Sequence, residues 1–173
     1  MKVHTSHPIV DTVLDRHLGE LGASFPVYRN HVLRCLNYQE RLLGEPVPRT
    51  AALAWAVHDL AIWTAGTWDY LEPSADLADV HAAEFGIADV AAVRRMVLDH
   101  HRIRGVDDRV TETFRLADRI DLTRGLWHRP LTRADVDSVV AQLPYLGFHR
   151  FLARRASSYA VHHPTRPMPM MRW

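Results

Sequence analysis

The stretch AALAWAVHDLAIW, residues 51–63, decides the fold. Its first part, from Ala51 to Val57, is apolar on every side of a helix, which is typical of a helix that is buried all round. The stretch then continues directly into His58 and Asp59. A carboxylate in such a place is costly unless it is paired or coordinated. The stretch therefore predicts a buried helix with a partnered carboxylate close to its end.

The remainder of the chain has the same helical character. Apolar residues recur at helical spacing nearly everywhere, and no segment keeps the period of two that marks a strand. We therefore predict an all-α bundle. Pro8 and Pro26 mark helix starts, and Ser74 and Thr132 are expected as N-caps. The predicted helices cover about 8–21, 26–43, 48–63, 74–86, 88–101, 108–126, 132–142 and 147–162.

The length of 173 residues fits one domain with a sizeable core. We expect a single domain over residues 1–173, with the residues that carry the chemistry in about 25–126. Residues 127–173 are expected to form C-terminal helices and an irregular tail. The tail, HHPTRPMPMMRW, is rich in proline and methionine, and we expect it to pack back on the bundle through Met170, Met171 and Trp173.

Charge and composition limit the partners. Lys and Arg number 21 against 20 Asp and Glu, so the net charge of +1 provides no field for nucleic acid, which is not an expected partner. No stretch approaches the roughly 18 apolar residues of a membrane span, so no membrane partner is expected. Cys35 is the one cysteine, and the start MKVHTSHPIV lacks the apolar run of a signal peptide. We therefore expect a cytoplasmic protein.

Three predicted helices place imidazole or carboxylate groups where apolar side chains belong. His31 takes a core position on the stripe of Val27 and Cys35, Asp118 lies on the stripe of Phe114, and the third group is the doublet at 58–59. A lone inward histidine is more often a hydrogen-bonded core residue than a ligand, and a lone His-Asp doublet can cap a helix. The joint pattern instead indicates a mixed nitrogen and oxygen ligand set, which borderline-hard cations take.

The order of these residues along the chain is a motif in itself. His31 in YRNHVLRCL, His58-Asp59 in LAWAVHDLAIWT and Asp118 in FRLADRIDL form the set H…HD…D. This set resembles the motif of the HD-domain superfamily of metal-dependent phosphohydrolases, over about residues 25–126. The resemblance implies an HD-like helical bundle in which His31, His58, Asp59 and Asp118 bind a divalent metal ion and His58 and Asp59 are catalytic. The ion would be Mn, Fe, Zn, Ni, Co or Mg, present once or twice.

Further histidines follow the doublet, as they do in many members of that family. His81 lies in ADVHAAEFGI, and His100 and His101 lie in MVLDHHRIRG. The resemblance implies that these residues bind a second metal or a substrate phosphate, with Asp59 as the bridge between two metals. The alternative for the pair is a helix C-terminus, where imidazolium meets free carbonyl groups favourably.

Four other residues are candidates for substrate binding. Trp63 and Trp68 follow the doublet, where an aromatic ring could stack on a nucleobase, although both could equally seal the core. Arg102 and Arg119 lie beside the histidine pair and Asp118, where a guanidinium could clamp a phosphate. The alternative for Arg119 is an ion pair with a neighbouring carboxylate.

The resemblance implies hydrolysis of a nucleotide or another small phosphorylated metabolite. In such a site the metal lowers the pKa of bound water from about 15.7 toward about 7 and neutralises charge on the phosphorus centre. The subfamily that cleaves cyclic dinucleotides has a Gly-Tyr-Pro signature that this chain lacks, so that activity is not expected. The alternatives are a di-iron oxygenase of the same superfamily and a non-catalytic ligand-binding or interaction module. The sequence leaves the oligomeric state open.

Overall fold

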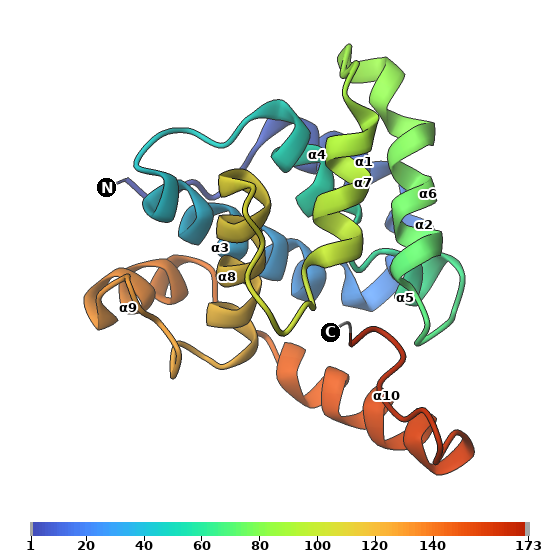
Figure 1. Cartoon of the computed structure of the whole chain (residues 1–173). Coiled ribbons are helices and arrows are strands. Elements are labelled where there is room, and N and C mark those ends of the chain that lie inside the picture. Colours follow the sequence, from blue (N-terminus) through green and yellow to red (C-terminus); the bar gives the residue numbers. More distant parts are fainter. Residues whose placement is uncertain (1, 172–173) are drawn as a thin grey trace.

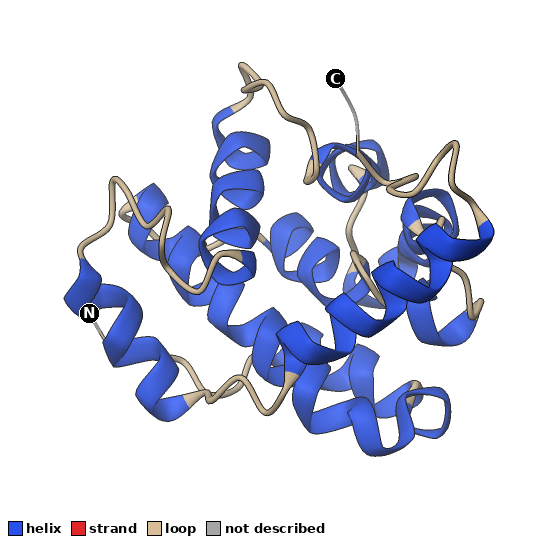
Figure 2. Cartoon of the chain, turned by 90° about the horizontal axis from the view of Figure 1, so that it is seen from below, coloured by secondary structure: helices blue, strands red, loops and turns tan. Residues whose placement is uncertain are grey.

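The computed structural model describes residues 2–171, and it confirms the all-α class (Figure 1). Figure 2 shows helices joined by loops, with no strand in this range. None of these helices combines the length and the apolar character that a bilayer crossing requires. The elements in chain order are α1 (Pro8–Arg16), α2 (Leu18–Leu21), η1 (Gly22–Ser24), α3 (Phe25–Leu43), α4 (Arg49–Val57), α5 (Ala61–Thr64), α6 (Leu71–Ala82), η2 (Ala83–Phe85), α7 (Val90–Asp99), α8 (Arg109–Leu122), α9 (Arg133–Gln142) and α10 (Phe148–His162).

Local signals set several helix ends as predicted. Pro26 lies in the first turn of α3, where its missing N–H costs nothing, and Gly44 ends α3 with a φ of 74°. Thr132 caps α9 through a capping box, in which its side chain and that of Asp135 accept hydrogen bonds from each other's backbone N–H groups. The helix predicted over 8–21 is divided at His17 into α1 and α2.

The prediction that Ser74 is an N-cap is wrong. Helix α6 begins earlier, at Leu71, because Pro73 is tolerated in a first helical turn. Ser74 is therefore buried inside α6, and its hydroxyl accepts a hydrogen bond of 3.2 Å from the backbone N–H of Ala61. The hydroxyl thus satisfies a backbone group at the start of a neighbouring helix, α5, rather than of its own.

The helix predicted over 48–63 is interrupted at the His-Asp doublet. Helix α4 ends at Val57, a turn covers residues 58–60, and α5 begins at Ala61. The backbone N–H of Leu60 donates to the carbonyl of Val57 at 3.0 Å, which tightens the chain at this point. His58 is fully buried in the turn and Asp59 is 4% exposed. The doublet therefore lies in a turn at the end of a buried helix.

Helices α3 and α4 form the centre of the bundle. Helix α3 packs against α1, α4 and α8, and α4 also packs against α6 and α7. Residues 51–57 of α4 are all buried, as their apolar character predicts, and the ring of Trp55 stacks on Phe114 with centroids 3.6 Å apart. This packing brings the inward faces of α3, α4 and α8 to one point.

Helix α10 and the C-terminal tail lie beside the place where these three inward faces meet. The chain turns back toward the bundle after α10 (Figure 1). A second apolar cluster joins α5 and the following loop to the tail, and Met170 is buried in it, 2% exposed, as the predicted packing requires. Met171 is only partly covered, at 41% exposed. Trp173, the third residue of that prediction, lies outside the described residues.

Candidate metal centre

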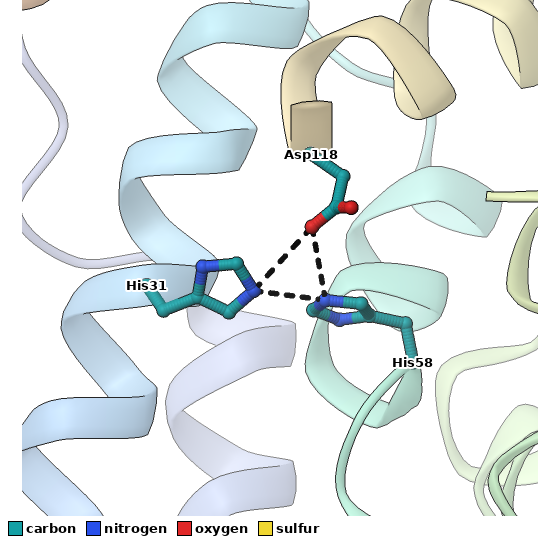
Figure 3. Close-up of side chains that lie close together, drawn as sticks. All are labelled: His31, His58 and Asp118. Atoms are coloured by element: carbon teal, nitrogen blue, oxygen red, sulfur yellow. Dashed lines mark hydrogen bonds and ion pairs between the residues drawn. The ribbon is translucent and has the colours of Figure 1, made fainter. Parts of the chain in front are cut away.

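Helices α3 and α8 and the turn after α4 bring imidazole and carboxylate groups together (Figure 3). The Nε2 atoms of His31 and His58 lie 3.0 Å apart. Asp118 Oδ1 lies 3.7 Å from His31 Nε2 and 3.9 Å from His58 Nε2. Asp59 Oδ2 lies 3.7 Å and 3.5 Å from the same two nitrogens. The four residues predicted as metal ligands therefore meet in one place.

A second pair of histidines lies on the far side of the two carboxylates. His100 and His101 follow the end of α7, with His100 Nε2 at 3.4 Å from Asp59 Oδ1 and His101 Nδ1 at 3.8 Å from Asp118 Oδ2. Each carboxylate thus presents one oxygen to each histidine pair. The donor cluster, as we name this arrangement, consists of His31, His58, Asp59, His100, His101 and Asp118.

Hydrogen bonds determine which nitrogens of the first pair are free. His58 Nδ1 lies 2.9 Å from the carbonyl oxygen of Trp55, which can only accept, so Nδ1 carries the hydrogen. His31 Nδ1 lies 2.8 Å from Asp121 Oδ2 and donates in the same way. In the neutral rings both Nε2 atoms therefore carry lone pairs, and these face each other at 3.0 Å. A cation between them would turn this repulsion into attraction, so the residues fit a metal ion.

Around His100, too, buried polar atoms of the donor cluster lack hydrogen-bond partners among the described residues. His100 Nδ1 donates to the carbonyl of Val97 at 2.6 Å, so its Nε2 is an acceptor facing Asp59. Neither His100 Nε2 nor Asp59 Oδ1 has a hydrogen-bond partner among the described residues. Burial lowers the pKa of His100, but the nearby carboxylates of Asp59 and Asp118 outweigh it, so the net pKa is raised. The two carboxylates thus favour positive charge at this position.

His58, Asp118 and Asp59 also have shifted pKa values. Burial lowers the pKa of His58 to about 3, so this ring is a neutral ligand at ordinary pH. It raises the pKa of Asp118 to about 6. Burial opposes ionisation of Asp59 as well, but the neighbouring histidines outweigh it and lower the pKa. The two carboxylates therefore differ in how readily they take up a proton.

A buried ion pair supports His31 from behind. Arg34 holds Asp121 by two hydrogen bonds, Nε to Oδ1 at 2.6 Å and Nη2 to Oδ2 at 2.9 Å. Burial opposes ionisation of Asp121, but Arg34 and His31 outweigh it and keep its pKa low. Neither Asp121 nor Arg34 is among the site residues predicted from the sequence. The available signal was spacing, because each lies three residues after a ligand, one helical turn further along the same face.

Cys35 also lies close to this ion pair but is a poor ligand. Its Sγ is 3.6 Å from His31 Nδ1, a nitrogen that already donates to Asp121. Burial raises the pKa of the Cys35 thiol well above its usual range, and only the thiolate binds metal well. The groups that could hold a metal ion are therefore those of the donor cluster.

A cavity of about 310 Å³ opens beside the donor cluster. Tyr70 lines it together with His31, Asp59, His101 and Asp118. The Tyr70 hydroxyl lies 2.7 Å from His101 Nε2, and burial raises its pKa well above the usual range, so it stays a neutral phenol. The other walls come from the loop after α5, the end of α8, α10 and the tail, through Trp68, Leu122, Phe148, Leu152, Met168 and their neighbours.

Of the predicted substrate-binding residues, Trp68 alone lies on the cavity wall. Trp63 instead stacks on Phe151, with centroids 5.0 Å apart and an interplanar angle of 8°, and so seals the bundle under α10. Arg102 lies 3.8 Å from the carboxylate of Asp99, the last residue of α7. Arg119 donates to the carbonyl of Arg102 at 3.1 Å. The structure does not bring either arginine to the cavity.

His81 is placed apart from the donor cluster. Its Nε2 lies 3.1 Å from His17 Nε2, at the junction of α1 and α2, and burial lowers its pKa. No group of metal donors among the described residues contains it. The expectation that His81 serves a second metal beside Asp59 is therefore not met by this geometry, and His100 and His101 occupy that side.

Comparisons of the chain with family models, with curated proteins and with solved structures found no match. The helical bundle and its buried histidines and aspartates are compatible with an HD-like fold. The chain therefore presents an all-helical structure with a buried His/Asp cluster that could hold a metal ion.

Proposed function

We propose that this chain is a metal-dependent phosphohydrolase of the HD type that acts on a small phosphorylated molecule. The observation that supports it most is the placement of two histidine pairs around two shared carboxylates. Hydrolases with two metals hold the ions about 3.5–4 Å apart, and shared carboxylates suit that spacing. The order H…HD…D along the chain favours the same assignment.

The charges of the donor cluster favour a phosphorylated substrate. Asp59 and Asp118 are the negative groups of the donor cluster. The nearby charge of Asp121 does not add to them, because Arg34 compensates it. Two divalent cations would exceed these two carboxylates by two positive charges, which the dianion of a phosphate monoester matches. A cation bound here would supply a Lewis acid that lowers the pKa of a water molecule and neutralises charge on phosphoryl oxygens.

Protein groups around the donor cluster would orient the reactants and supply a proton. Asp121 fixes the ring of His31 through the Nδ1 hydrogen bond, which directs Nε2 inward. His101 Nε2 can donate to the Tyr70 oxygen, which leaves the phenolic hydrogen free for an oxygen of the bound ester. The apolar walls of the cavity would reduce the contact of a bound ester with bulk water and so strengthen the polar contacts inside it.

Phosphate release from a panel of phosphorylated compounds tests the proposal. With Mn²⁺ or Fe²⁺ supplied, the protein should release phosphate from at least one nucleoside monophosphate, sugar phosphate or aryl phosphate. His58→Ala should lose this activity completely, whereas His81→Ala, a matched loss of an imidazole outside the donor cluster, should keep it. If wild type and His58→Ala are indistinguishable on every compound, a contaminating phosphatase explains the signal and hydrolysis is refuted for that panel.

A di-iron oxygenase is a second candidate, and the cavity is the observation that favours it. Four histidines and two carboxylates also suit a pair of iron ions, and an apolar cavity suits an uncharged substrate. Protein purified with iron, with an absorption spectrum that changes on exposure to oxygen, would favour this candidate. Phosphate release that depends on His58 and needs no oxygen would favour the hydrolase.

A further inference from the structure

The cavity beside the donor cluster has two unlike ends. One end is the donor cluster itself, with Tyr70 beside it. The opposite wall is apolar and comes mainly from α10, through Phe148, Leu152, Ala153 and Ala156. A volume of about 310 Å³ lies at the lower end of the range of small-molecule sites and exceeds that of a bicyclic aryl group.

The C-terminal tail completes the apolar wall. Met168, Met170 and Met171 all line the cavity. Met170 is buried, while Met168 and Met171 are 45% and 41% exposed, which places them toward solvent. Methionine side chains are flexible and polarisable, so they adapt to apolar ligands of different shape.

Cationic side chains are missing from the cavity wall. No arginine or lysine of residues 2–171 lines it. The polar side chains away from the donor cluster are those of Trp68 and His149, and burial lowers the pKa of His149, so that ring is neutral. Trp68 Nε1 and His149 Nδ1 are buried without partners and offer one donor and one acceptor.

This inventory of polar groups disfavours nucleotides and sugar phosphates. A ribose and a base carry many hydroxyl, amino and carbonyl groups, and each would lose its water on entry. One donor and one acceptor cannot replace that many hydrogen bonds, and a buried polar group without a partner weakens binding. An aryl or alkyl group, by contrast, gains from burial against methionine, leucine and phenylalanine.

We propose that the substrate is a phosphate monoester of an uncharged, apolar aryl or alkyl alcohol, whose apolar group lies in this cavity with its phosphate at the donor cluster. The inference rests on the proposed function and specifies its substrate class. It replaces the expectation of a nucleotide, because the cavity has an apolar wall and no cationic side chain of its own.

Competition between substrates is the first test. With Mn²⁺ supplied, kcat/KM for 1-naphthyl phosphate should exceed that for adenosine monophosphate and for glucose 6-phosphate by about tenfold or more, the usual scale for a mismatch in an apolar pocket. Ala153→Phe should fill the cavity and lower kcat/KM for 1-naphthyl phosphate by a similar factor. Ser157→Phe is the matched control, because it adds the same ring to an exposed position of α10 outside the cavity and should change nothing.

Binding of 1-naphthol, the product without phosphate, is the second test and needs no catalysis. Calorimetry should detect binding to wild type and to Ser157→Phe, and binding at least about tenfold weaker to Ala153→Phe. Binding with this pattern but no hydrolysis of any ester would refute the proposed function and leave the apolar site standing. Faster hydrolysis of a nucleotide, or 1-naphthol binding that Ala153→Phe does not weaken, would overturn the inference.

Discussion

Two histidine pairs in this molecule have nearly the same nitrogen–nitrogen distance and different chemistry. The Nε2 atoms lie 3.0 Å apart in His31 and His58 and 3.1 Å apart in His17 and His81. In the first pair both Nδ1 atoms donate to acceptors, so the two Nε2 lone pairs are left facing each other. In the second pair His81 Nδ1 has no hydrogen-bond partner within residues 2–171, so the ring can carry its hydrogen on Nε2 and donate it to His17. The distance between two imidazoles therefore does not identify a candidate metal site, whereas their outer hydrogen bonds show which nitrogens are free to bind a metal.

The neighbouring carboxylates are a further difference between the two histidine pairs. Asp59 and Asp118 lie within 4 Å of the first pair and are at most 4% exposed. The carboxylate nearest to His17 is that of Glu20, which is 46% exposed and faces the outer nitrogen, Nδ1, at 3.4 Å. A buried carboxylate needs a cation, and an exposed one is satisfied by water. The predictions below test whether this difference decides metal binding.

Metal content should show the largest contrast. Wild-type protein never exposed to chelator should contain at least one equivalent of a divalent transition metal, and Asp59→Ala should contain less than about a tenth of an equivalent while staying helical. Metal analysis and circular dichroism measure both. Chelation should also lower the Tm of wild type, because a ligand at 100 to 1,000 times its Kd stabilises by about 3–4 kcal/mol. Full metal occupancy in Asp59→Ala would assign the doublet to helix capping.

Breaking the ion pair of Arg34 and Asp121, which supports His31, should have the next largest effect, and this effect is on stability. Asp121→Asn leaves the buried charge of Arg34 unpaired, which should cost about 3–5 kcal/mol of unfolding free energy. Urea denaturation of metal-free protein measures this cost. Combining Asp121→Asn with Arg34→Met should recover part of the loss, since the unpaired charge is removed. A cost below about 1 kcal/mol for the single variant would contradict a tightly coupled ion pair.

The pH dependence of metal affinity should be smaller and should follow Asp118. In the metal-free protein the pKa of Asp118 is about 6, so below that pH the carboxyl is protonated and must release a proton to bind metal. The affinity should fall at least about tenfold, or about 1.4 kcal/mol, for each pH unit below about 6, because His100, whose pKa is raised, must also lose its proton where it binds the metal. His58 does not contribute above pH 4, because its pKa is about 3. A calorimetric titration at several pH values that shows a constant affinity from pH 4 to 6 would exclude Asp118 as a ligand.

The smallest effect should come from the pair of His17 and His81. His81→Ala removes one hydrogen bond outside the donor cluster and should cost about 1 kcal/mol of stability. Its metal content should equal that of wild type, measured side by side with Asp59→Ala. A lost equivalent of metal in His81→Ala would show that His81 belongs to a metal site after all, and the contrast between the two pairs would fail.

The sequence by itself determined the helical class and the inward positions of the ligands. Periodicity placed His31 and Asp118 on buried faces, and the apolar run of 51–57 placed the doublet beside the core. These inferences succeeded because burial depends on spacing within one helix, which a sequence displays directly. The capping residue Thr132 was equally readable, since a capping box is confined to four consecutive residues.

The tertiary structure alone decided which inward residues meet. His81 and His100 are both buried histidines near helix ends, and only the packing of α7 beside α4 and α8 brings His100 to Asp59. The role of Arg34 also depends on a partner 87 residues away, which no local pattern reveals. The apolar wall of the cavity comes from α10 and the tail, which are distant from the donor cluster in the sequence. That this wall faces the donor cluster could therefore not be predicted from the sequence. Contacts between distant segments are set by how whole faces pack together, and a single sequence does not encode that choice locally.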